Sequence, residues 1–223
     1  MARAATEVSD RSRTQDRILS AAMKLYTGRG YQVTSFVAIC QTAGLPEHIV
    51  RTHYRDESQV FLGVLDRVRE YVVEPGIEKI AKAPETAQEK LVAFVHGMSQ
   101  VASTRADYLV FLILMQIELR NSEEEVRAKL MTLVGHLHRT VEGIIKLGWM
   151  RSRFRTDLKS AELTALVMGS INGAMLEWYT RRDQLQGREL TRTLRLVLMR
   201  GLEDFITIQN IRASGQPAPG FHP

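Results

Sequence analysis

Apolar side chains recur with the period of an α-helix along almost the whole chain, and no clean alternating pattern of the strand type is present. The first predicted helix begins near Thr14 as its N-cap and ends at Gly28 and Gly30. Its buried face consists of Ile18, Ala21, Ala22, Leu25 and Tyr26. The pattern as a whole predicts an all-α protein with about nine helices.

Two short helices joined by a tight turn follow this first helix. Thr34 or Ser35 is the expected N-cap of the first, and Gly44 supplies the turn. The second runs from Pro46 to about His53, with the proline in the first turn, where its missing N–H costs nothing. This arrangement predicts a helix-turn-helix.

The rest of the chain is also predicted to be helical. Asp56 and Gln59 have the spacing of a capping box, so a helix begins there. Pro75 predicts a kink or a break around residues 74–76, and Pro84 predicts a helix boundary at residues 83–84. Further helices are predicted over residues 91–101, 107–119, 121–148, 158–179 and 188–211, with a basic loop at 150–157.

Composition excludes several classes of protein. The single cysteine, Cys40, rules out an intrachain disulfide framework, which fits a reducing cytosol. The most apolar segment, residues 109–117, is far shorter than the roughly 20 residues that span a bilayer. The N-terminus carries no apolar run of signal-peptide length. We therefore expect a cytoplasmic protein without a membrane partner, and a net charge of +5 permits an anionic one.

Catalytic and metal-binding motifs are missing from the sequence. It contains no nucleotide-binding glycine loop and no metalloprotease helix motif. His136 and His138 are two positions apart, so on a helix they point about 200° away from each other and cannot share a metal ion. We expect no cofactor, no metal site and no enzymatic activity.

The segment from residue 34 to residue 61, TSFVAICQTAGLPEHIVRTHYRDESQVF, resembles the DNA-binding segment of the TetR (tetracycline-repressor-like) family. Ala43-Gly44-Leu45 matches the family's turn, and His53-Tyr54 matches its His-Phe pair. The preceding helix and its exit, Gly28-Arg29-Gly30-Tyr31, match as well. The sequence departs from the family pattern at Pro46, Glu47 and Glu57.

The resemblance implies a helix-turn-helix DNA-binding domain over residues 1–56, in which residues 1–13 form a flexible arm. A helical ligand-binding and dimerisation domain would occupy residues 57–212, and the Gly/Pro-rich tail over 213–223 is expected to be disordered. The resemblance also implies dimerisation through the last two helices, for which packing within one chain is the alternative. The corresponding residues here are Leu163, Val167, Ser170, Ile171, Ala174, Leu194, Val197, Leu198, Leu202 and Phe205.

The recognition helix has two distinct faces. Ile49 and Val50 can pack inward, while polar neighbours project outward, and Arg51 is long enough to read a guanine edge or hold a phosphate. Alternatives remain for His53, which packs as readily as it contacts phosphate, and for Tyr54, which also suits an anchor to the core. The predicted DNA-binding residues are Arg13, Thr34, Ser35, Pro46, Glu47, His48, Arg51, Thr52, His53 and Tyr54.

Methionine and aromatic residues gather on the middle helices, and such side chains adapt to apolar ligands. Glu118 is the carboxylate among them, and if it faces inward the predicted ligand also carries a positive charge. For each residue taken alone, ordinary core packing is the alternative. The predicted effector-binding residues are Phe61, Val64, Phe94, Met98, Phe111, Met115, Glu118, Met168, Met175 and Trp178.

Together these features predict a ligand-responsive regulator, a repressor that binds palindromic double-stranded DNA as a homodimer and is released by a small hydrophobic molecule. The alternative is a helical small-molecule-binding or protein-interaction module that has lost specific DNA binding. It is motivated by Glu47 and Glu57, because negative charge weakens attraction to phosphates. The sequence does not specify the effector, the operator or the regulated genes.

Overall fold

The computed structural model describes residues 2–121, 124–151 and 153–203. Within these ranges all regular structure is helical: nine α-helices, one π-helical turn and one 3-10 turn. The prediction of an all-α protein is confirmed. None of the helices in these ranges has the combination of length and apolar composition that crossing a membrane requires. Phe205 and the tail predicted over 213–223 lie outside the described residues.

The chain forms two compact units, and each unit is built from two separate stretches of the sequence. Among the described residues, the first contains 2–74, 104–121 and 124–135, and the second contains 75–103, 136–151 and 153–203. The predicted domain boundary between residues 56 and 57 lies inside the first unit. The physical reason is that aromatic side chains from the segments after residue 56 pack directly on the first helix.

Helix α1 (Ala2–Arg29) is longer than predicted. Residues 2–13, predicted to be a flexible arm, are helical, and Thr14 lies within the helix rather than capping it. Its hydroxyl donates to the carbonyl of Asp10, one turn earlier. No proline or glycine interrupts the segment before Gly28, so the helix continues through it. It ends at Gly30, which has the left-handed φ of +94°.

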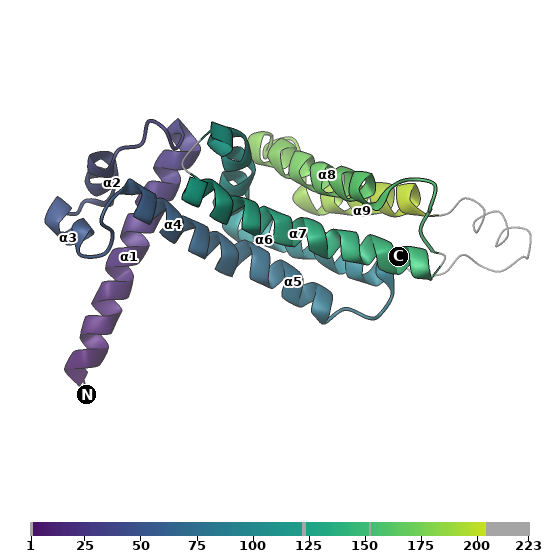
Figure 1. Ribbon diagram of the computed structural model, residues 1–223, viewed down its shortest axis with the longest axis horizontal. Coiled ribbons are helices and arrows are strands. Elements are labelled where there is room, and N and C mark those ends of the chain that lie inside the picture. Colours follow the sequence, from purple (N-terminus) through teal and green to yellow (C-terminus); the bar gives the residue numbers. More distant parts are fainter. Residues whose placement is uncertain (1, 122–123, 152, 204–223) are drawn as a thin grey trace, which may run out of the picture. The chain divides into compact units, whose positions relative to one another are not determined.

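The helix-turn-helix forms as two short helices beside α1 (Figure 1), and it has the predicted local signals. In α2 (Phe36–Ala43), the Ser35 side chain caps the first turn by accepting from the N–H of Ala38, and Gly44 ends the helix with a φ of 62°. Helix α3 (Glu47–Arg51) follows Pro46. Helix α4 (Glu57–Val68) is capped by Asp56, which accepts from the N–H of Gln59 at 2.9 Å.

Of the kink or break predicted at residues 74–76, the break is not present. Helix α4 leads through a π-helical turn, η1 (Arg69–Val73), directly into α5 (Glu74–Ala81). The N–H of Glu74 bonds to the carbonyl of Arg69, five residues earlier. This wider turn gives the ring of Pro75 the space that a regular α-turn would deny it, so the chain stays helical.

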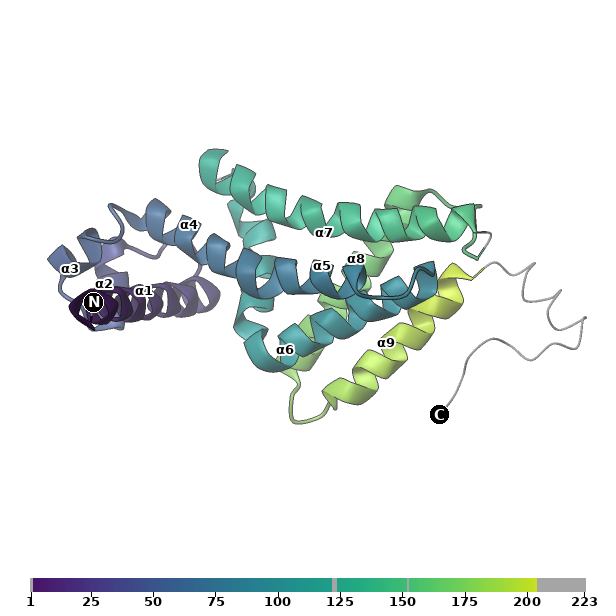
Figure 2. The ribbon, with the colours of Figure 1, turned by 90° about the horizontal axis from the view of Figure 1, so that it is seen from below.

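Helix α6 (Ala87–Glu118) replaces the two helices predicted over 91–101 and 107–119. The predicted interruption survives as a kink at Arg105, whose backbone is not helical (φ −143°, ψ 42°). In the second unit, α5 and the first part of α6 run antiparallel (Figure 2). They approach closely where Gly97 faces Gly76.

Helix α7 (Glu124–Met150) follows a 3-10 turn, η2 (Leu119–Asn121). Gly148, predicted to end this helix, lies inside it. The following segment folds back, and the buried ring of Phe154 covers Gly148. The Trp149 indole N–H also donates to the carbonyl of Arg155 at 2.8 Å. The basic loop predicted at 150–157 is therefore packed against the helix before it.

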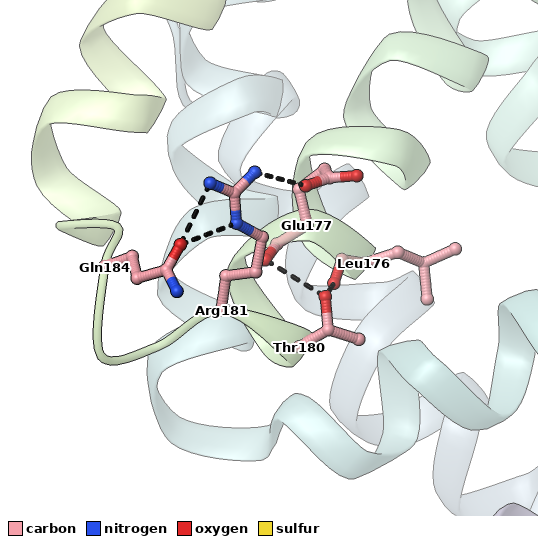
Figure 3. A network of polar contacts seen from close by, with 5 residues as sticks. All are labelled: Leu176, Glu177, Thr180, Arg181 and Gln184. Atoms are coloured by element: carbon pink, nitrogen blue, oxygen red, sulfur yellow. Dashed lines mark hydrogen bonds and ion pairs between the residues drawn. The ribbon is translucent and has the colours of Figure 1, made fainter.

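Helices α8 (Ser160–Thr180) and α9 (Gly187–Leu202) lie side by side in the second unit. The turn between them is held by Arg181, whose guanidinium bonds to the Gln184 side chain at 3.0–3.1 Å and to Glu177 Oε2 at 3.3 Å (Figure 3). The hydroxyl of Thr180 donates to the carbonyls of Leu176 and Glu177.

Candidate DNA-binding surface

The inner face of the helix-turn-helix is apolar and buried. Ile39 and Val50 are fully buried, and Phe36 is nearly so, while α2 packs on α1. The opposite face of α3 is exposed and polar. Its exposed residues, together with the flanking positions, are Pro46, Glu47, His48, Arg51 and Thr52. The first unit thus presents a short helix with the two faces that the sequence predicts.

Arg17 holds the turn between α2 and α3. Its Nη2 donates to the carbonyls of Ala43 at 2.9 Å and Gly44 at 3.2 Å, so α1 satisfies the carbonyl groups at the end of α2. This role of Arg17 was not predicted from the sequence. No local signal could have revealed it, because the partners are separated by 26 and 27 positions.

Arg51 is held by several groups of its own chain. Its Nε donates to Glu47 Oε1 at 2.7 Å, and its Nη2 lies 2.6 Å from the same oxygen. Its Nη1 donates to the carbonyl of Arg55 at 2.7 Å. The guanidinium carbon lies 4.7 Å from the centre of the Phe36 ring. Glu47 and Arg51 therefore form one fixed, neutral pair on the exposed face.

Several predicted DNA contacts also have partners within the chain. The hydroxyl of buried Thr34 donates to the carbonyl of Gly30 at 2.6 Å, and Ser35 caps α2. The Thr52 hydroxyl donates to the carbonyl of Ile49. Exposed Arg13 lies 3.9 Å from Asp10. Contacts from these side chains to DNA stay predictions.

His53 and Tyr54 both pack against the protein. The Nδ1 atom of His53 is buried and has no hydrogen-bond partner among the described residues. Burial, with the nearby positive charge of Arg11, lowers the pKa of His53. Tyr54 lies against Gly63 of α4, and burial raises the pKa of its hydroxyl. The anchoring alternative for Tyr54 fits this position.

Cys40 lies on the inner face of α2 and is buried. Burial raises the pKa of its thiol, and the negative charge of Glu47 adds to the effect. The thiol is thus kept protonated at neutral pH. No group of metal-ligating side chains occurs in the part of the chain that the structure describes.

An aromatic cluster joins α1 to α4 and α6 within the first unit. The rings of Tyr26 and Phe61 are 5.1 Å apart, those of Phe61 and Phe111 are 5.3 Å apart, and Tyr31 lies 4.6 Å from Phe61. Tyr26, Phe61 and Phe111 are almost completely buried. This cluster fixes the end of α1, and hence the helix-turn-helix, to the helices that follow.

Glu118 makes a second connection to the same region. Its Oε1 accepts a hydrogen bond from the backbone N–H of Gln32 at 3.1 Å, in the loop between α1 and α2. A Cβ atom on Gly30 would lie 2.7 Å from that oxygen, so only glycine leaves room for the carboxylate. Glu118, one of the predicted effector-binding residues, therefore holds this loop in the structure, and a contact with the effector stays a prediction.

Comparison with known proteins identifies the family. The model described as "YsiA-like protein, C-terminal region", one of the C-terminal models for TetR regulators, matches residues 59–201. The chain belongs to the TetR family of transcriptional regulators. The matched residues lie almost entirely outside residues 34–61, so the match independently confirms the family that those residues resemble.

Individual relatives of this TetR-family chain agree with the assignment. The fatty acid metabolism regulator protein of Bacillus subtilis (strain 168) is 20% identical over 188 residues, 84% of this chain and 95% of that protein. The crystal structure of the MbdR regulator from Azoarcus sp. CIB has a TM-score of 0.76 and 29% identity, over 86% of this chain and all of that one. That of FadR from Bacillus subtilis in complex with stearoyl-CoA has a TM-score of 0.66 and 21% identity, over 84% and 98%.

The predicted effector-binding residues of this TetR-family chain are divided between the two units. Phe61, Val64, Phe111, Met115 and Glu118 belong to the first, and Phe94, Met98, Met168, Met175 and Trp178 to the second. Within the first unit, Phe61 and Phe111 are in contact, and within the second, Phe94 and Met98 both lie near Gly76. Met168 and Met175 are buried, and Arg182 stacks on the half-buried Trp178 at 4.6 Å. Their role in effector binding stays a prediction.

The predicted dimer-interface residues are divided between core and surface. Leu163, Val167, Ile171, Leu198 and Leu202 are buried within the single chain, so their apolar stripe packs α8 and α9 onto their own unit. Ala174 and Leu194 are half-buried, and Ser170 and Val197 are exposed. The exposed face of the two helices also carries Leu166, Gly169, Gly173 and Gly201.

Proposed function

We propose that this chain is a ligand-released repressor that binds palindromic operator DNA as a homodimer. The observation that carries the proposal is α3 itself, a short helix with Val50 buried and Glu47, His48 and Arg51 exposed. A helix with such faces can enter the major groove while α1 and α2 support it. Arg11 and Arg13, exposed on α1, supply positive charge for the DNA backbone.

The proposed dimer surface is the exposed face of α8 and α9. Leu166 and Val197 each remain 63% exposed there, and Gly169, Gly173 and Gly201 have open space where a side chain would be. Glycine within a helix costs roughly 1 kcal/mol relative to alanine. Within the chain no side chain packs closely against these glycines, so no contact offsets this free energy. Close approach of a second copy would offset it. Two copies would present their recognition helices about 34–36 Å apart, one turn of DNA.

The proposed effector is a small, mainly hydrophobic molecule, and an acyl chain is the class that we favour. Supporting this, the buried methionine and phenylalanine side chains on α6 and α8 form adaptable apolar surroundings. Two relatives support the same class. One is FadR from Bacillus subtilis, whose crystal structure contains stearoyl-CoA, and the other is the fatty acid metabolism regulator protein of Bacillus subtilis. Effector binding would favour a conformation in which the two recognition helices no longer match the groove spacing.

The test measures DNA affinity by fluorescence anisotropy, with duplexes from the region upstream of the protein's own gene and shuffled duplexes of equal composition. We expect tight binding to a palindromic duplex, with the logarithm of affinity falling linearly with the logarithm of salt concentration. Adding an acyl-CoA series should release the DNA. Equal affinity for the shuffled duplexes would contradict operator binding and favour the second candidate, a ligand-binding module that has lost specific DNA recognition.

A further inference from the structure

The pair formed by Glu47 and Arg51 has a chemistry that suits one base pair. We infer that Glu47 reads the N4 amino group of a cytosine in the operator, and that Arg51 is the residue that positions its carboxylate. This inference rests on the proposed function, because it requires α3 to enter the major groove. It goes further by naming the base that Glu47 contacts and by giving Arg51 a positioning role.

The geometry makes Glu47 the more available partner for a base. The Nε–H of Arg51 donates to Oε1 of Glu47 at 2.7 Å, and Nη2 forms an ion pair with the same oxygen at 2.6 Å. The other oxygen, Oε2, takes no hydrogen bond from any described residue. The Glu47 side chain remains 47% exposed. A carboxylate is thus held in place by one oxygen while the other is presented to the surroundings.

Arg51 is itself fixed by contacts that do not involve DNA. Its Nη1 bonds to the carbonyl of Arg55 beyond the end of α3, and its guanidinium lies against the ring of Phe36 in α2. Both partners belong to the helix-turn-helix, so the guanidinium is anchored before any ligand arrives. Such preorganisation lowers the entropy lost when the neighbouring carboxylate meets a base.

Charge explains why a carboxylate can be tolerated in this position. An isolated Glu47 would be repelled by the phosphates on both sides of the groove. Arg51 offsets that charge at hydrogen-bond distance, so the pair is neutral overall. The departure from the family pattern at position 47 therefore does not by itself abolish DNA binding.

The chemistry of the bases then selects the target. A carboxylate only accepts hydrogen bonds, so it can pair only with an amino group in the major groove, on cytosine N4 or adenine N6. Adenine places its N7 acceptor beside that amino group, which repels a second carboxylate oxygen. Cytosine has no such acceptor beside its N4 amino group in the major groove, so a C·G pair suits the carboxylate better.

The experiment starts from a randomised duplex library, from which the wild-type protein selects its binding sequence. Each base pair of the selected half-site is then replaced in turn, and affinities are measured for wild type, Glu47→Gln and Arg51→Lys. We expect one position at which C·G→T·A weakens wild-type binding about tenfold per half-site. In Glu47→Gln this ratio should fall to within about twofold, because an amide both donates and accepts. Arg51→Lys should also reduce it, since an ammonium cannot hold the carboxylate in the same way.

Glu57→Gln is the matched control. It removes the same charge from the exposed first turn of α4, outside the recognition helix. It should raise the affinity for every duplex by a similar factor and leave the base preference at each position unchanged. Far-UV circular dichroism of each variant verifies that the helices are intact.

The outcomes separate this inference from the proposed function. If the wild type selects a palindrome and the Glu47→Gln variant keeps the full cytosine preference, the inference is overturned and operator binding is left intact. A requirement for adenine at that position also overturns it. A wild-type protein that enriches no sequence at all overturns both.

Discussion

At the scale of single residues, Gly30 and Glu118 show how one missing side chain creates a contact. Gly30 adopts a left-handed backbone conformation and leaves the space that the Glu118 carboxylate occupies. The carboxylate then accepts from the N–H of Gln32. The loop that leads from α1 into the helix-turn-helix thus depends on two residues that are distant in sequence.

Replacing Gly30 with alanine should destabilise the protein for two separable reasons. The left-handed conformation costs roughly 1–2 kcal/mol for a residue with a Cβ atom, and the clash with Glu118 adds to this. In the double variant Gly30→Ala/Glu118→Ala the clash disappears and the strain remains. Urea unfolding of the two single variants and the double variant should therefore show a loss smaller than the sum of the single losses. Additive losses would show that the carboxylate does not press on position 30.

His53 should make stability depend on pH. Its pKa is lowered in the folded protein from an ordinary value of 6.5, chiefly by burial, so the unfolded chain binds a proton that the folded one resists. The stabilising contribution is complete above that ordinary value and is lost as the pH falls below it. Thermal unfolding between pH 7.5 and pH 5 should show a smaller loss of stability for His53→Gln than for wild type. His48→Gln, exposed on α3, is the control, and an equal reduction in that variant would count against burial as the cause.

At the scale of elements, the two irregular turns in the helices lie next to the positions where the chain passes from one compact unit to the other. The π-turn over residues 69–73 precedes the change at residues 74 and 75, and the kink at Arg105 follows the change at residues 103 and 104. Tyr71 of the π-turn meets Arg105 at 4.6 Å and Tyr108 at 5.3 Å. Its hydroxyl also receives a hydrogen bond from Arg67. The two irregular turns are therefore joined by side chains of the first unit.

Two of the three glycines in helix α7 should respond in opposite directions to the same substitution. An alanine at Gly148 would overlap the buried ring of Phe154, and we expect Gly148→Ala to cost about 1–3 kcal/mol through overpacking. Gly143 is exposed with open space around it, so Gly143→Ala should stabilise the helix by up to about 1 kcal/mol. Chemical denaturation measures both. A neutral result at Gly148 would mean that the segment after α7 is not packed on the helix.

The elements could be predicted from the sequence where the signal is local. The serine cap of α2, the glycine at its end and the capping box of α4 each involve residues within one turn of each other. The contacts of Arg17 with Gly44 and of Glu118 with Gln32 join distant positions, and a periodic pattern contains no trace of them. Of the kink or break predicted around Pro75, the break did not occur, because a π-turn, which has no sequence signature, accommodates the ring.

At the scale of the whole molecule, the apolar stripes of α8 and α9 were interpreted as a surface for a partner. Much of that stripe turned out to be the core of the chain itself, including Leu163 and Val167. A helix whose strongest apolar stripe faces inward must use a second, weaker face for a partner, and that face mixes glycines with Leu166 and Val197. Hydrophobicity alone cannot distinguish the two faces, because burial within a subunit and burial between subunits favour the same side chains.

The dimer surface can be tested with one substitution at two glycines. Gly173→Arg places a long charged side chain on the exposed face of α8 and should produce a monomer in sedimentation velocity experiments, with loss of operator binding. Gly143→Arg makes the same change on exposed α7, outside the proposed surface, and should leave the dimer unchanged. A dimeric Gly173→Arg protein would place the interface elsewhere.

The buried thiol of Cys40 has a practical consequence. Maleimides and iodoacetamides attack the thiolate, and a thiol that is both covered and kept protonated reacts slowly with them. The natural chain should therefore need no cysteine removal before spectroscopic labelling. A cysteine introduced at an exposed position of α1 or α9 would take up a fluorophore or nitroxide selectively, so that distances between labels can be followed as DNA and acyl compounds are added.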